Sequence, residues 1–345
     1  MMRTCLCITL AFMALLASPA TKADGRDEPY KFFSDFVGLN EDQIGTIRSG
    51  KPLAKVVGST TPDEVFVFGA VYVNATPESY LALATNIDAL RKLPGYLAIQ
   101  GFSDPPQLSD LDGFALKLQD IEELKSCKVG HCEVQLPTEA MEEFKQSIDW
   151  SAPDVDDRVN ELARRMALQA LLDYLQGGNA ALGVYRDKSH PAAVAETFAS
   201  LTTRLGALPV YLPELDEYLL DYPRAKSDNV QAGFYWEEVN FGLKPTFRIV
   251  QRVVYRGAST TGPAYAVAEK QLYANHYFET ALDLTVCVKD AQRPGFYIIT
   301  VKGSKQAGLT GLKGSIVRKV AVDKARSSLE RVLLSIKQEL ESERP

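Results

Sequence analysis

The chain is poor in histidine, in net positive charge and in long apolar runs. Its 345 residues include 3 histidines, and 38 lysines and arginines are outnumbered by 44 aspartates and glutamates, which gives a net charge of −6. An acidic protein has little general attraction for phosphate, so we expect no nucleic-acid partner. The patterns G-x-S-x-G, H-E-x-x-H and G-x-G-x-x-G are missing. We therefore expect no cofactor, no metal and no catalytic residue that a motif identifies.

The one long apolar run lies at the N-terminus. Arg3 precedes an apolar stretch from Leu6 to Ala17, and the small residues of "SPATKA" follow it. This pattern predicts a signal peptide over residues 1–23, and it is too short to span a bilayer. The alternative is a buried N-terminal helix. We expect an exported, soluble protein, periplasmic or extracellular, which is neither a lipoprotein nor transmembrane.

Three cysteines lie outside this segment. Cys127 and Cys132 have four residues between them, with Gly130 available for a tight loop, and Cys287 lies in a strand pattern. In an oxidising compartment the spacing favours a Cys127–Cys132 disulfide. The alternatives are two free thiols, or a metal site that uses His131 as well. A structural zinc site needs a fourth ligand, and no second cysteine or histidine pair is present to supply it.

The middle of the chain differs in character from its two ends. Residues 24–61 read as an extended lead-in, and 62–106 contain a strand (64–73), a helix that starts at Thr76-Pro77 and a second strand (95–102). Helical patterns dominate 107–235, and strands return in 236–345. One helical stripe, which includes Met166 and Ala170, could form a ligand groove, but core packing is favoured.

Strands joined by short turns fill 246–302, a Gly-rich loop is predicted at 303–315, and a long amphipathic helix follows. Short turns favour antiparallel pairing, and a terminal helix must bury its apolar stripe on the sheet. The predicted fold class is therefore α+β: a curved antiparallel sheet that grips a long C-terminal helix, with a helical block inserted at 107–235.

This order of elements resembles that of a known superfamily. The segment "VYVNATPESYLALATNIDAL" is a strand that runs into a helix beginning with proline, and later strands and a C-terminal helix follow. Over about 62–105 and 246–342 the order resembles the START-like helix-grip superfamily of polyketide-cyclase and lipid-transport proteins. The resemblance implies a curved sheet around the last helix and an apolar cavity between them. Many members bind lipids there, and no catalytic motif of the family maps onto this chain.

The apolar side of the strands and the stripe of the terminal helix are predicted to meet around that cavity. The candidate lining residues are Phe247, Ile249, Val253, Tyr255, Leu282, Leu284, Val286, Leu329, Val332, Leu333 and Ile336. The leading hypothesis is a non-catalytic carrier of an apolar small molecule or lipid. The alternatives are a cyclase- or hydrolase-type enzyme that uses polar groups of the same cavity, and a module that binds another envelope protein.

The stretch "KQLYANHYFETALDLTV" (270–286) invites an active-site interpretation. His276 falls where the alternation breaks, which predicts a hairpin turn and a solvated histidine, while Glu279 and Asp283 lie on the polar face of the next strand. Arg248 and Arg252 occupy the polar face of 246–257. Cross-strand ion pairs explain these charges better than an acid–base pair does.

A cluster of basic residues follows the last strand. It could contact anionic lipid headgroups, although a solvated loop and helix face is the simpler explanation. The candidate residues are Lys302, Lys305, Lys313, Arg318 and Lys319.

Overall fold

The computed structural model describes residues 29–59, 61–205, 207–240, 244–257, 263–306 and 311–342. The predicted signal peptide (1–23) lies outside these residues. Within them, no helix has the length and apolar content that crossing a membrane requires.

An eight-stranded antiparallel sheet forms the centre of the molecule. Its strands lie in the order β1-β2-β10-β9-β8-β7-β6-β3. Their bounds are β1 (Leu53–Val57), β2 (Glu64–Val73), β3 (Tyr96–Gly101), β6 (Val230–Val239), β7 (Thr246–Arg256), β8 (Tyr265–Ala274), β9 (Phe278–Lys289) and β10 (Phe296–Gln306). Neighbours from β6 to β10 follow each other in the chain, so short connections join them.

Both faces of the sheet are covered, so β2 is buried along all of its length. Because side chains alternate along a strand, Val67 and Val71 pack with the C-terminal helix α10 (Gly311–Ser342). Phe68 and Tyr72 point the other way, into a cluster around Phe33. We call the two sides the α10 face (that of Val67 and Val71) and the insertion face (that of Phe68 and Tyr72).

The α10 face also carries two short helices, α2 (Pro77–Thr85) and α3 (Ile87–Leu90). The side chain of Thr76 caps α2 by accepting a hydrogen bond from Ser79 N, and Pro77 takes the first helical position, as predicted. Gly69 lets α10 approach β2 closely, because a Cβ there would lie 2.6 Å from Leu329 Cδ2.

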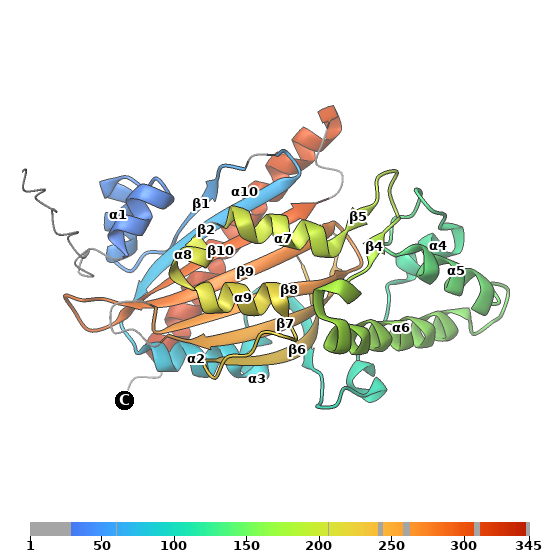
Figure 1. The fold of residues 1–345 in the computed structure, drawn as a ribbon. Helices are drawn as coiled ribbons and strands as arrows, with labels where there is room; N and C mark the ends of the chain where they lie inside the picture. The colour runs from blue at the N-terminus through green and yellow to red at the C-terminus, as the bar shows by residue number, and fades with distance from the viewer. Residues whose placement is uncertain are drawn as a thin grey trace, which may run out of the picture.

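A helical block lies between β3 and β6. Its α-helices are α4 (Leu118–Ser126), α5 (Thr138–Ser147), α6 (Val155–Gly177), α7 (Val194–Arg204), α8 (Ala207–Tyr211) and α9 (Pro213–Asp221). Its smaller elements are the 3-10 helices η2 (Leu108–Leu111) and η3 (Gly178–Ala181) and the strand pair β4 (Val184–Tyr185) and β5 (Ala192–Ala193). Figure 1 shows α7 and α9 crossing one face of the sheet, α10 behind the other, and α4, α5 and α6 beyond the strand ends.

The predicted fold class is confirmed: a large antiparallel sheet, a long C-terminal helix and an inserted helical block. Three local predictions are wrong. The described part of the lead-in, 29–59, is mainly helical rather than extended, since it forms the π-helix η1 (Phe32–Phe36), α1 (Glu41–Arg48) with a capping box at Asn40, and β1. Strand β6 begins at Val230, so the expected boundary at 235/236 falls inside it. The Gly-rich segment is a strand up to Gln306 and a helix from Gly311.

Candidate functional site

A cavity of about 220 Å³ lies on the α10 face, between the sheet, α10 and the α2–α3 pair. Helix α10 supplies an apolar roof from its predicted stripe. The roof residues are Ala325, Leu329, Val332, Leu333 and Ile336. Four of them, Leu329, Val332, Leu333 and Ile336, are candidate lining residues of the sequence analysis.

The floor of this cavity combines apolar strand residues such as Val67 and Val267 with a group of charged side chains. Arg248 Nε donates to Glu237 Oε1 at 2.8 Å, and Arg252 Nε donates to Glu269 Oε1 at 2.9 Å. Each arginine lies directly opposite its partner on the neighbouring antiparallel strand. Such facing pairs place their Cβ atoms about 5 Å apart, which suits an ion pair.

The Arg252–Glu269 pair holds its charges in spite of burial, whereas burial leaves the pKa of Glu237 above its ordinary value although Arg248 lowers it. Burial alone raises the pKa of Glu269, but attraction to Arg252 brings it below its ordinary value. Burial likewise lowers the pKa of Arg252, and the Glu269 carboxylate more than offsets this effect. Removing one member of a buried pair costs about 3–5 kcal/mol, because it strands the other charge. The charged part of the floor is therefore a fixed polar surface.

A third pair and a hydroxyl pair extend this floor along β9 and β10. Lys302 lies opposite Asp283 and forms an ion pair with it, and Thr285 and Thr300 share a hydrogen bond of 3.0 Å. Glu279 pairs with Lys305 at 3.3 Å. These charges are in cross-strand ion pairs, as predicted. The expected neighbours are wrong, because β8 lies between β7 and β9, and the arginines of β7 pair with β6 and β8.

The seven candidate lining residues of the strands lie on the insertion face. Val253, Leu282 and Leu284 are buried in a cluster with α7, α8 and α9, and Tyr255 and Val286 pack against it. Phe247 and Ile249 join a cluster that contains Leu171 and Tyr174 of α6. The prediction that these residues face the terminal helix is wrong.

The physical reason is that both faces of the sheet are covered. The apolar side of β7 packs on the inserted helices, so the polar side of the same strand lies on the α10 face, where it lines the cavity and Arg252 donates to Ala84 O of α2. Sequence reasoning missed Arg248, Arg252 and Glu269 as cavity residues. The signal was the alternation that places arginines on one side of the strand, and it was interpreted only as cross-strand ion pairing.

The basic candidates do not form one free patch. Lys302 and Lys305 are in ion pairs within the sheet. Arg318 donates to Ser59 Oγ at 3.0 Å, and Lys319 is exposed on α10. The side chain of Lys313 lies outside the described residues.

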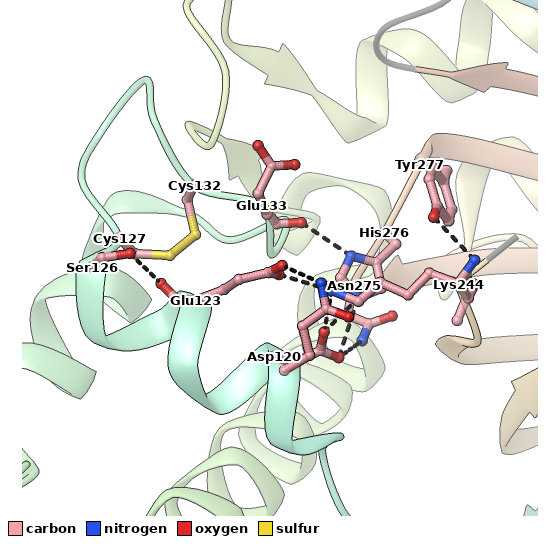
Figure 2. A network of polar contacts seen from close by, with 12 residues as sticks. Asp120, Glu123, Ser126, Cys127, Cys132, Glu133, Lys244, Asn275, His276 and Tyr277 are labelled. Atoms are coloured by element: carbon pink, nitrogen blue, oxygen red, sulfur yellow. Dashed lines mark hydrogen bonds and ion pairs between the residues drawn. A yellow bond between two sulfur atoms is a disulfide. The ribbon is translucent and has the colours of Figure 1, made fainter. Parts of the chain in front are cut away.

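The β8–β9 turn holds a buried polar network, which Figure 2 shows. His276 Nε2 lies 3.1 Å from Asp120 Oδ1, and His276 Nδ1 lies 3.0 Å from Glu133 O. Lys244 Nζ reaches both Asp120, at 2.6 Å, and Glu123, at 2.8 Å.

The hairpin position of His276 is confirmed by the strands on either side of it, but the prediction that it is solvated is wrong, since it is 3% exposed. Both of its ring nitrogens face acceptors, so neither is placed to take a proton from a substrate. The network links α4 of the insertion to the central sheet, and we assign it a structural role.

The disulfide lies at the end of α4, beside this network (Figure 2). Cys127 and Cys132 lie at disulfide-bonding distance, as predicted, and Cys287 is free and buried.

Comparison with known proteins assigns no family to this arrangement. No protein-family model matches the chain, and no curated protein matches it at a significant level of similarity. The functional conclusion therefore depends on the geometry of the site.

Proposed function

We propose that the protein is exported and soluble, and that it binds a small apolar molecule or the end of a lipid chain without catalysis. The observation that carries this proposal is the cavity between the sheet and α10. Its roof of Leu329, Val332, Leu333 and Ile336 suits an apolar body. The paired charges opposite suit a polar end group, so an amphipathic ligand fits best.

The order of elements supports a helix-grip relationship. A strand (β2), two helices (α2 and α3) and a strand (β3) come first, and antiparallel strands and α10 come last. The large insertion separates the two parts and covers the opposite face of the sheet, so it leaves room for the cavity under α10.

The charges of the cavity favour binding over catalysis. Arg248, Arg252, Glu269, Asp283 and Lys302 line the cavity, and each is in an ion pair. A general acid or base must be able to exchange a proton with a substrate, and an ionised group held by its partner does this poorly. The disulfide and the predicted signal peptide support a periplasmic or extracellular location.

The test is native mass spectrometry of the purified protein and of the variant Ala325→Trp. We expect the wild type to carry an apolar molecule and the variant to lose it, because the indole ring occupies the cavity. Val320→Trp is the matched control, since Val320 is 45% exposed on the same helix. This control should retain the ligand.

A second variant tests whether the insertion face of the sheet is close-packed against the inserted helices. Val253 is fully buried among the inserted helices, so Val253→Trp should lower the free energy of unfolding by about 1–3 kcal/mol or more. Ala325→Trp should change it little. A wild type without any apolar ligand, together with strong destabilisation by Ala325→Trp, contradicts the proposal. If the protein changes the mass of the molecule that it binds, the alternative is supported, in which the protein is a cyclase- or hydrolase-type enzyme.

A further inference from the structure

A second cavity, of about 260 Å³, lies on the insertion face. It is a partly open cavity that lies between α4, α5 and α6 of the helical block and β7 and β8 of the sheet. Its walls are mainly apolar, and they include Leu116, Ala140, Phe144, Met166, Phe247 and Leu272. Phe247 and Ile249, which sequence analysis assigned to the cavity under α10, line this one instead.

Small residues of α6 create the space. Ala163, Ala167 and Ala170 recur at helical spacing and line the cavity together with the larger Met166. The stripe to which Met166 and Ala170 belong was predicted to be core. Val159 and Leu162, one to two turns earlier, are indeed buried among apolar side chains. The stripe is therefore core in its first half and cavity wall in its second.

The polar groups of this cavity are few, and most are already used. Asn275 Oδ1 accepts from Phe247 N at 2.9 Å, and Asn275 Nδ2 donates to Asp120 at 3.3 Å. Tyr185 differs from these. It is 4% exposed, and its hydroxyl oxygen accepts from Ala274 N at 3.3 Å. None of the hydrogen bonds described for Tyr185 uses its hydroxyl hydrogen, which leaves one donor at an apolar site.

We propose that this cavity is a second ligand site, for a neutral, apolar molecule that carries one hydrogen-bond acceptor. An apolar cavity of roughly 150 Å³ binds benzene, so a cavity of about 260 Å³ takes a molecule of about ten non-hydrogen atoms. A charged ligand is excluded, because no opposite charge lines the inner wall to offset its desolvation. The one carboxylate in the lining, Asp173, is exposed and accepts from Gln169 at 2.8 Å.

This site is independent of the cavity under α10. Strand β7 separates the two, with Arg248 and Arg252 on one side and Phe247 and Ile249 on the other. The inference therefore does not depend on the function proposed above.

The probes are 1-indanone and indane, which share a bicyclic body and differ by one carbonyl. We expect both to bind the wild-type protein in calorimetric titrations, 1-indanone more tightly. Tyr185→Phe should raise the Kd of 1-indanone about 2- to 10-fold, which is the net effect of one hydrogen bond. It should leave the Kd of indane unchanged, because indane has no acceptor.

Ala167→Phe should abolish binding of both compounds by filling the cavity, and Ala325→Trp should leave both affinities unchanged. Circular dichroism checks that each variant is folded. If Ala167→Phe does not fold, the different response of the two compounds to Tyr185→Phe still decides the question. The proposal fails if neither compound binds the wild type, or if Tyr185→Phe affects both compounds equally. It also fails if Ala325→Trp, rather than Ala167→Phe, removes binding.

Discussion

A buried lysine gives the sharpest test of the energetics of this fold. Lys270, on β8, is fully buried on the insertion face. Its ammonium donates to Tyr174 Oη at 3.0 Å, to Leu219 O at 3.0 Å and to Asn179 Oδ1, and it lies 4.3 Å from the centre of the Phe198 ring. No carboxylate is among the contacts described for it. Its charge is therefore solvated by neutral groups alone.

Burial lowers the pKa of Lys270 from 10.5 to about 7. Because the folded state loses this proton more readily than the unfolded state, the unfolded chain holds more protons between pH 7 and pH 10.5. Stability must then rise with pH across this window. Across the whole window the lowered pKa of Lys270 makes the free energy of unfolding rise by ~5 kcal/mol, at about 1.4 kcal/mol for each unit by which the pKa is lowered. Between pH 7 and pH 9 the free energy of unfolding rises by ~2 kcal/mol, since Lys270 is already neutral in half of the folded molecules at pH 7.

The assay is urea unfolding of the wild type and of Lys270→Met at pH 7, 8 and 9. Other groups titrate in this range, but they are common to both proteins and cancel in the difference. We expect the free energy of unfolding of the wild type, minus that of the variant, to rise by ~2 kcal/mol from pH 7 to pH 9. Lys289→Met, at an exposed residue of β9, should show no such change. A constant difference for Lys270→Met would refute the reasoning.

Two further predictions concern covalent and packing features. Thiol counting on the denatured, unreduced protein without residues 1–23 should find one free cysteine, Cys287, and three reactive thiols would contradict the disulfide. Gly69→Ala should lower the free energy of unfolding by about 1–3 kcal/mol in denaturant titrations, because its Cβ meets Leu329 of α10. Gly45→Ala, whose Cβ has no neighbour within 4 Å in helix α1, is the control and should be neutral or stabilising. Equal effects of the two glycine variants would contradict the close approach.

The elements themselves could be read from local signals. The β-branched and aromatic run of β2, the Thr76-Pro77 start of α2 and the stripe of α10 all form what they predict. Each of these signals is complete within a few residues, so no knowledge of the tertiary structure is needed. The short helix α1 was missed, although Asn40 and Gln43 form the capping box that marks its start.

The side of the sheet that meets α10 could not be read in this way. Alternation along β7 separates Arg248 and Arg252 from Phe247 and Ile249, but it does not say which set lies inward when both faces are covered. The answer depends on strand order, because Glu237 and Glu269 neutralise the arginines only once β6 and β8 flank β7. The second cavity was hidden for the same reason, since its walls come from segments far apart in the chain.

The pairing of β2 with β10 has a consequence for the order in which the molecule is made. Strand β2 is apolar along nearly all of its length, and its neighbours in the sheet are β1 and a strand that ends at Gln306. During synthesis, the second edge of β2 therefore stays unpaired until β10, near the end of the chain, has been made. Contacts between segments so far apart in the chain slow folding, and they leave the unpaired edge of β2 exposed to aggregation for seconds. A chain of this topology gains from being kept unfolded until it is complete.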